Sequence, residues 1–223
     1  MSRDRETVKA ELIAEATRSG VLRKATDEEL GARIAELALE LEALNPTPDP
    51  TRRPDLYVGR WKTLFSTFNL EKETTLARLS FGKLTSGPIT VGELYQEVGP
   101  EDEDCRYDNV VTFTDAAGNP GAKVMMGRFT VEDGHKLGVV FYEVFATPED
   151  DRTIENFKVD AGIAPESPVR RVIEKTPPLH SSIIYLDDDL RLNRGVYGGV
   201  YVLQKVSADY TPTRLRAPEL ETA

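Results

Sequence analysis

The chain has 223 residues, of which 39% are hydrophobic and 30% are charged, a composition typical of a folded globular protein. Its 28 basic and 38 acidic residues give a net charge of −10, which opposes binding to nucleic-acid phosphates or anionic membranes by general electrostatics. No stretch approaches the ~20 apolar residues that a transmembrane helix needs. The single cysteine, Cys105, excludes an internal disulfide.

Two helices are expected at the start of the chain. Residues 5–17 place apolar side chains at helical spacing, namely Val8, Leu12, Ile13 and Ala16. Thr26 followed by Glu29 forms a capping box, which predicts that a second helix begins there. The proline-rich segment 46–50 ends this helix, because proline lacks the backbone N–H that a helix needs.

One face of the second helix is an apolar stripe. Its members recur at spacings of four and three residues: Leu30, Ile34, Leu37, Leu41 and Leu44. Such a stripe packs either on the rest of the chain or on a partner protein, and the residues leave both possibilities open.

From residue 55 onward short strands dominate. The predicted strands are 56–68, 74–84, 89–98, 107–114, 122–132, 136–146, 154–160, 182–187 and 196–206. Turn-forming residues separate them, most clearly Asp133 and Gly134, and no long helix intervenes. Residues 161–181 are predicted to form a loop, with a short helix at 169–174, that covers a barrel mouth.

This strand pattern is typical of an antiparallel barrel or sandwich, and closure into a barrel would remove the exposed edges of the sheet. The predicted fold class is mainly β, with an antiparallel β-barrel preceded by two N-terminal α-helices. The helical extension occupies residues 1–50 and the barrel domain residues 51–207. Residues 208–223 are predicted to be a poorly ordered tail.

The first predicted strand carries the only tryptophan of the chain. Alternation of side chains places Gly59, Trp61 and Phe65 on one face of this strand. Small barrels commonly close one end by stacking a guanidinium group on an indole ring. We therefore expect Gly59 and Trp61 to close one end of the barrel, supported by Arg191 and Arg194.

Three adjacent aspartates precede these arginines: Asp187, Asp188 and Asp189. They lack the alternation and the glycine of a calcium-binding EF-hand loop, so a structural role is the better interpretation. One of them caps the turn and another pairs with Arg191 or Arg194. The candidate closure and head-group residues are thus Asp188, Arg191 and Arg194, together with Gly59.

Apolar side chains on the predicted inner faces form the candidate ligand site. They are Trp61, Phe65, Met125, Phe129, Phe141 and Phe145. These side chains either line a cavity for one small apolar molecule or fill the barrel, and the residues alone leave both possibilities open. An anionic head group would be held by Arg191, Arg194 or Arg128.

Groups that could carry out catalysis are scarce. The two histidines, His135 and His180, lie in a predicted turn and a predicted loop, and no spacing typical of a zinc or di-iron site occurs. We therefore predict that the protein is not an enzyme and holds no metal or other cofactor. The enzymatic alternative requires a polar pocket around His180 and the aspartates.

Three blocks of sequence resemble the plastid lipid-associated protein (PAP/fibrillin) family. They are LNPTP at residues 44–48, GRWKTLF at residues 59–65 and YLDDDLRLNRG at residues 185–195. The resemblance runs from roughly Glu40 to Val206, and the last block is the most specific. It implies a lipocalin-like barrel, and it implies a lipid-related function because members are associated with carotenoid- and quinone-rich lipid bodies and thylakoids.

From this resemblance we expect non-enzymatic binding of a hydrophobic small molecule (a lipid, an isoprenoid quinone or a carotenoid) at or near photosynthetic membranes. The alternative is a scaffold for a membrane-associated enzyme, with docking through Leu30, Ile34, Leu37 and Leu41. The first residues of the chain show no targeting segment. The expected location is therefore the cytoplasm or the thylakoid periphery of a cyanobacterium, or a plastid if a transit peptide was removed.

Overall fold

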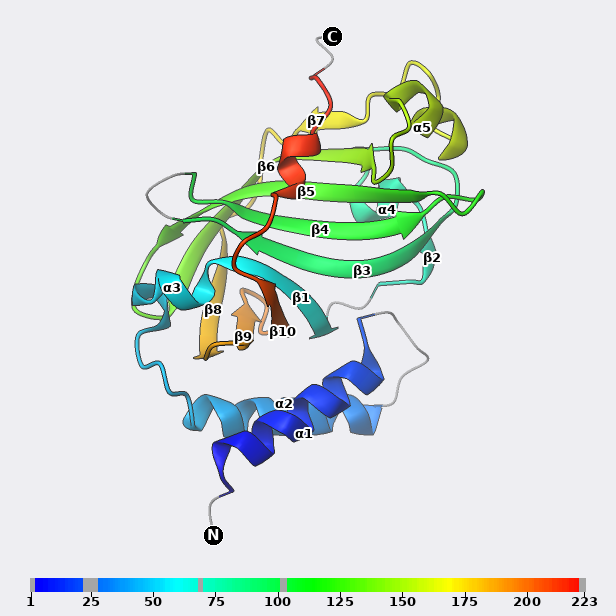
Figure 1. Cartoon of the computed structure of the whole chain (residues 1–223). Helices are drawn as coiled ribbons and strands as arrows, with labels where there is room; N and C mark the ends of the chain where they lie inside the picture. Colours follow the sequence, from blue (N-terminus) through cyan, green and yellow to red (C-terminus); the bar gives the residue numbers. More distant parts are fainter. Residues whose placement is uncertain (1–2, 22–27, 68–69, 101–103, 221–223) are drawn as a thin grey trace.

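The computed structural model describes residues 3–21, 28–67, 70–100 and 104–220 of the chain. Two helices, α1 (Arg5–Ser19) and α2 (Glu28–Ala43), precede a β-rich body (Figure 1). The strands are β1 (Gly59–Ser66), β2 (Glu73–Thr74), β3 (Ile89–Val98), β4 (Tyr107–Thr114), β5 (Pro120–Val131), β6 (Lys136–Pro148), β7 (Arg170–Val172), β8 (Leu179–Leu186), β9 (Leu190–Gly195) and β10 (Val200–Ser207). The short helices are η1 (Pro50–Arg52), α3 (Pro54–Tyr57), α4 (Leu76–Leu79), α5 (Ile154–Asp160) and η2 (Thr213–Arg216).

Eight of the strands form a closed antiparallel barrel. The order around the ring is β1, β10, β9, β8, β6, β5, β4 and β3, and the ring closes where β1 pairs with the end of β3. The remaining strands, β2 and β7, pair with the parts of β3 and β6 that extend beyond the closed ring. The predicted fold class, an antiparallel barrel with two N-terminal helices, is confirmed.

The predicted strands at 89–98 and 107–114 coincide with β3 and β4. The predictions for 74–84 and 154–160 are wrong, because these segments contain the helices α4 and α5. Threonine starts both helices: the side chains of Thr75 and Thr153 accept hydrogen bonds from backbone N–H groups three residues later. The predicted helix at 169–174 is also wrong, because β7 pairs there with β6.

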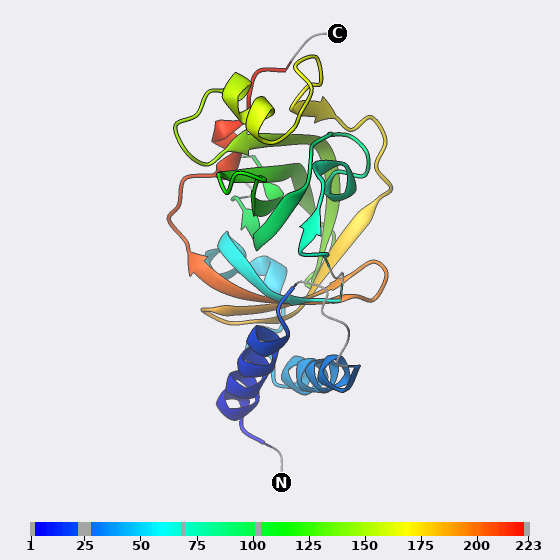
Figure 2. The same cartoon turned by 90° about the vertical axis from the view of Figure 1, so that its right-hand side faces the viewer.

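Helices α1 and α2 cover the outer face of β1, β8, β9 and β10. Figures 1 and 2 both place them against this wall of the barrel and away from β4 and β5. The stripe of α2 is buried in this layer, with exposed fractions of 0% for Ile34, Leu37 and Leu41 and 8% for Leu30. Of the two possibilities that the sequence left open, the structure shows the stripe packed on the rest of the chain, so the chain itself covers these side chains. The predicted capping box at Thr26 lies outside the described residues.

An ion pair fixes α1 to the turn between β8 and β9. The ammonium of Lys9 lies 2.8 Å from a carboxylate oxygen of Asp187 and also bonds Asp189. Asp187 accepts further hydrogen bonds from the Tyr185 hydroxyl (2.5 Å) and the Leu190 backbone N–H (2.8 Å). Lys9 and the interactions with Tyr185 and with backbone N–H groups lower the pKa of Asp187 against the opposing effect of burial. The aspartates thus anchor a helix, and the predicted pairing with Arg191 or Arg194 is wrong.

Asp187→Ala is expected to lower the free energy of unfolding by about 2–3 kcal/mol. The substitution removes the carboxylate that pairs with the Lys9 ammonium. It also removes the acceptor of the Tyr185 hydroxyl, which then lacks this hydrogen bond. Asp188→Ala is the matched control, because Asp188 is exposed and surface substitutions usually change stability by less than about 0.5 kcal/mol. Urea unfolding measures both variants, and equal losses would contradict the anchoring role.

The chain after β10 packs on the barrel, so the prediction of a poorly ordered tail is wrong for residues 208–220. In Figure 1 this segment crosses the outside of the sheet over β5 and β6. The buried carboxylate of Glu97 accepts hydrogen bonds from the backbone N–H and the hydroxyl of Thr213, at 2.8 and 2.7 Å. Asp108, beside Glu97 on the neighbouring strand, accepts two hydrogen bonds from the Arg214 guanidinium, at 2.6 and 2.7 Å. Burial raises the pKa of both carboxyl groups.

Within the described ranges, none of the helices combines the length and the apolar character that crossing a bilayer requires.

Candidate ligand site in the barrel

The barrel interior contains four of the six predicted lining residues. Trp61 and Phe129 lie in an apolar cluster at the end near α3, and Met125 lies in a second cluster towards α4 and α5. Phe141 is half-buried and contacts both clusters. The other two residues face outward: Phe65 packs against the helices, and Phe145 lies under the C-terminal segment.

Two β-bulges explain why Phe65 and Phe145 lie outside. The register between β1 and β10 shifts between Thr63 and Phe65, and the register between β5 and β6 shifts opposite Tyr142. A bulge adds one residue to a strand, so every side chain beyond it changes face. Strict alternation from Trp61 or Phe141 therefore places the later phenylalanine on the wrong side.

Trp61 forms the centre of the closed barrel end and is fully buried. The guanidinium carbon of Arg191 lies 4.6 Å from the centroid of the Trp61 ring, and the ammonium of Lys205 lies 5.2 Å from it. The indole N–H donates to the Tyr57 carbonyl at 2.9 Å, at the end of α3. The predicted stacking of a guanidinium on Trp61 is thus present, and it involves Arg191.

Gly59 permits the close approach of the strands at this end. Its φ is +138°, a backbone conformation that favours glycine, and a Cβ atom there would lie 2.8 Å from the carbonyl oxygen of Ser207. This is the position that the sequence assigned to barrel closure.

Arg191 is a buried cation without an acidic partner. Its exposed fraction is 0%, and its guanidinium donates to the Gln96 side-chain oxygen and, at 3.4 Å, to the Tyr57 carbonyl. Its Nε has no acceptor among the described residues, and no described carboxylate lies within ion-pair distance. Burial lowers the pKa of Arg191 to about 10, so the group stays cationic at neutral pH.

Lys205 adds a second positive charge beside the same ring. Its ammonium donates to the Leu56 carbonyl at 2.7 Å, again in α3. Burial and then the neighbouring Arg191 lower its pKa. Arg191 and Lys205 thus place two positive charges on the Trp61 ring, and both donate to neutral oxygen atoms. The resulting positive potential inside the barrel would be neutralised by an anion or a strong oxygen acceptor.

Asn193 lies two residues after Arg191 on β9, so its side chain is on the same inner face. Asn193 is 2% exposed and donates from its amide to the Ser181 hydroxyl at 2.9 Å, while its amide oxygen accepts no hydrogen bond from the described part of the chain. Asn193 lies opposite Tyr201 of β10, a half-buried tyrosine that contacts the cluster around Trp61. Polar groups are therefore concentrated on one wall of the lumen.

The remaining predicted head-group residues lie outside the lumen. Asp188 is exposed, and Arg194 pairs with Glu42 of α2 at 2.8 Å. Arg128 is exposed on the outer face of β5, with its guanidinium 5.2 Å from the Tyr142 ring centroid. The structure brings together Trp61, Arg191 and Gly59, and it separates them from Asp188 and Arg194.

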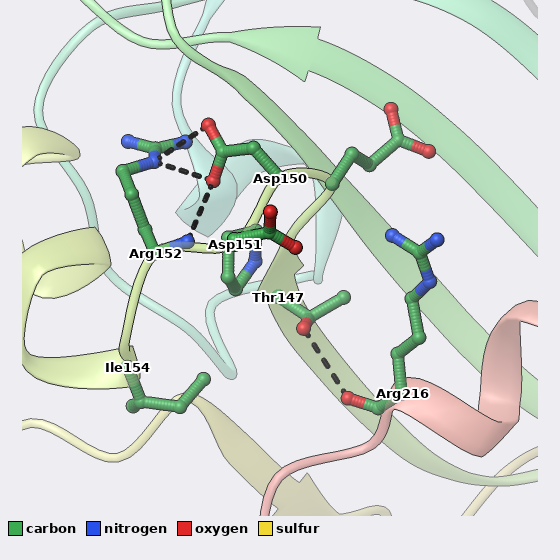
Figure 3. A pocket seen from close by; sticks show the side chains of 8 residues that line it. Thr147, Asp150, Asp151, Arg152, Ile154 and Arg216 are labelled. Carbon is green, nitrogen blue, oxygen red and sulfur yellow. Dashed lines mark hydrogen bonds and ion pairs between the residues drawn. The ribbon is translucent and has the colours of Figure 1, made fainter.

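Two hollows open on the surface of the molecule, and neither borders a predicted lining residue. One, of about 320 Å³, lies between the β6–α5 loop and η2 (Figure 3). Its Arg152 is already paired with Asp150, Asp115 and Asp160, so the charge of this guanidinium is already compensated within the protein. The other, of about 510 Å³, lies between α2 and the outer face of β8 and includes His135 and Arg194.

The described residues include no group of three or more histidine, cysteine, aspartate or glutamate side chains that could hold a metal ion. The site instead consists of apolar side chains, two cations and a few neutral polar groups. Such an arrangement can bind and orient a molecule.

The comparison with known families agrees with the blocks noted in the sequence. The PAP_fibrillin family model matches residues 6–204. The chain belongs to the PAP_fibrillin family. The match spans both helices and nearly the whole barrel, so it covers Trp61 and Arg191 alike.

Individual PAP_fibrillin relatives are similar at a lower level. A chromoplast-specific carotenoid-associated protein of Cucumis sativus is 28% identical over 208 residues, covering 80% of this chain and 62% of the relative. A probable plastid-lipid-associated protein 2 of Arabidopsis thaliana is 28% identical over 207 residues, covering 79% and 64%. A plastid-lipid-associated protein of Citrus unshiu is 29% identical over 207 residues, covering 79% and 61%. The matched part thus spans less than two thirds of these relatives.

Proposed function

We propose that this PAP_fibrillin protein binds, without catalysis, a hydrophobic molecule with an acidic or carbonyl oxygen head group inside its barrel. The supporting observation is Arg191, a fully buried guanidinium whose hydrogen-bond partners among the described residues are neutral, and whose Nε–H has no acceptor among them. An oxygen acceptor on the ligand would complete its hydrogen bonds. The relatives named for carotenoids and plastid lipids support a lipid as the ligand class.

The apolar part of the lumen fits the other end of such a molecule. The clusters around Trp61 and Met125 together line the interior from α3 to α4 and α5. Each ligand methylene buried there would contribute about 0.8 kcal/mol. These side chains pack against one another in the structure, so a ligand gains access by displacing the flexible Met125 and the half-buried Phe141.

The positive charges of Arg191 and Lys205 discriminate among the candidate ligands. A fatty-acid carboxylate or the carbonyl oxygen of an isoprenoid quinone accepts hydrogen bonds from Arg191, whereas a hydrocarbon carotene offers no acceptor. Acidic lipids and quinones are therefore the proposed ligands ahead of unsubstituted carotenes. The proposed location is a plastid, which the relatives named chloroplastic or chromoplastic support, or the surface of a photosynthetic membrane.

Trp61 provides the test, because it is the only tryptophan in the chain and lies at the site. Binding of cis-parinaric acid, a fluorescent polyene fatty acid, is expected to quench Trp61 emission by energy transfer. The methyl ester of the same acid is expected to bind about tenfold or more weakly, since it carries no charge. Arg191→Met is expected to weaken binding of the acid about 10- to 100-fold and to weaken binding of the ester less, since the ester keeps a carbonyl acceptor but carries no charge.

Arg128→Met is the matched control for this experiment. It removes an arginine that the sequence also suggested for the head group, but one that is exposed on the outer face of β5. Its binding curves for acid and ester are expected to equal those of the wild type. Equal binding of acid and ester by the wild type would contradict the role of Arg191, and absence of energy transfer would contradict a site in the lumen.

A further inference from the structure

One lysine lies inside the barrel at its apolar end. Lys123 is on the inner face of β5, between Val111 of β4 and Ala146 of β6, and its exposed fraction is 4%. Val111 and Ala146 both belong to the apolar cluster that α4 and α5 close. Two residues earlier, Gly121 lies so near Phe113 and Phe157 that a Cβ atom would contact both rings, so this end is tightly covered.

The ammonium group of Lys123 has no partner in the described part of the chain. Among the residues that the structure describes, no hydrogen bond or ion pair joins Lys123 to another side chain or carbonyl. Burial alone lowers its pKa to about 8. About one tenth of the amine is therefore uncharged at pH 7, compared with roughly 0.04% for a lysine with the ordinary pKa near 10.4.

An uncharged amine among apolar side chains is a nucleophile for carbonyl compounds. We propose that Lys123 forms an imine with a hydrophobic aldehyde that enters the lumen. The Nζ lone pair attacks the carbonyl carbon to give a carbinolamine, which loses one water molecule as the C=N bond forms. The step needs no oxidant or reductant.

Other buried lysines are less suited to this reaction. The ammonium of Lys158 donates to the Pro165 carbonyl at 3.0 Å, and that of Lys205 donates to the Leu56 carbonyl at 2.7 Å. A lone pair becomes available there only when these hydrogen bonds break.

The inference rests on the proposed function in one respect, since both require an apolar molecule to enter the lumen.

The test uses the full chain, all-trans-retinal as the polyene aldehyde and sodium cyanoborohydride to reduce any imine to a stable amine at pH 7. We expect a single adduct by intact mass, located by peptide mapping at Lys123. Its formation is expected to be about 100-fold faster than at the exposed Lys175, in line with the difference in uncharged amine. Lys123→Met should lose this adduct, whereas the control Lys175→Met should retain it.

Two results would overturn the inference. One is an adduct spread over exposed lysines at similar rates, and the other is an adduct yield that Lys123→Met leaves unchanged. Quenching of Trp61 by retinal without any adduct would reject the imine and leave the proposed ligand site intact. Absence of both quenching and adduct would reject the inference and also count against access to the lumen.

Discussion

Arg214→Met is expected to lower the free energy of unfolding by about 3–5 kcal/mol. The guanidinium makes two hydrogen bonds of 2.6 and 2.7 Å to Asp108, whose exposed fraction is 0%. Removing one member of a buried ion pair leaves the other charge uncompensated. Arg216→Met, an exposed residue in the same turn, is the matched control and is expected to change stability by less than about 0.5 kcal/mol.

The loss in Arg214→Met is also expected to depend on pH. Burial already raises the pKa of Asp108 against the opposing effect of Arg214, and without Arg214 this pKa rises further. A carboxyl group with a raised folded-state pKa binds more protons in the folded than in the unfolded state, so acidification recovers stability. Urea unfolding at a series of pH values should therefore show the deficit shrinking from neutral towards acidic pH. A deficit independent of pH would contradict this account of the ion pair.

Lys123→Met is expected to increase the free energy of unfolding by about 3 kcal/mol at pH 7. Burial lowers the pKa of Lys123 from 10.5 to about 8, and this difference corresponds to about 3 kcal/mol against the charged form in the folded state. A flexible apolar side chain of similar length removes that penalty.

The pH dependence of this stability difference follows from the lowered pKa of Lys123. The folded state binds fewer protons than the unfolded state between pH 8 and 10.5, so wild-type stability rises relative to Lys123→Met across this window. The advantage of the variant should be full below pH 8 and disappear above pH 10.5. Lys175→Met, at an exposed position, should show no such window. A variant less stable than the wild type at pH 7 would show that the ammonium is stabilised in the barrel.

Pattern and resemblance predicted the barrel, both N-terminal helices and the stacking of an arginine on Trp61. The helices were predictable because their apolar residues follow a local periodicity. The stacking on Trp61 was predictable because the sequence blocks that carry it lie at the barrel end. The segment 154–160 was predicted as a strand and is the helix α5. Thr153, Ile154, Phe157 and Ala161 carry the competing signal, a threonine cap followed by apolar residues at helical spacing.

The errors in the candidate site have a different origin. Phe65 and Phe145 were placed by alternation, and a bulge cannot be located from alternation alone. Lys123 could have been found, because it is two residues from Met125 on a strand whose face was correctly assigned. The packing of Arg214 on Asp108 joins positions 106 residues apart, and no local pattern in the sequence signals it.

The charge of Arg191 is expected to serve ligand binding and to contribute little to the free energy of unfolding. We expect three contributions to nearly cancel in the free protein: stacking on Trp61 and hydrogen bonds to Gln96 and Tyr57 stabilise, and burial of an uncompensated cation destabilises. Arg191→Met should therefore change the free energy of unfolding by no more than about 1 kcal/mol, in contrast to Arg214→Met.

Unfolding of the wild type and Arg191→Met, each with and without oleate, measures this most directly. At an oleate concentration 100-fold above the wild-type dissociation constant, the free energy of unfolding of the wild type should rise by about 2–3 kcal/mol. At the same concentration, that of Arg191→Met should rise little. A loss of 3 kcal/mol or more in the ligand-free variant, together with an unchanged gain from oleate, would show that Arg191 only supports the barrel.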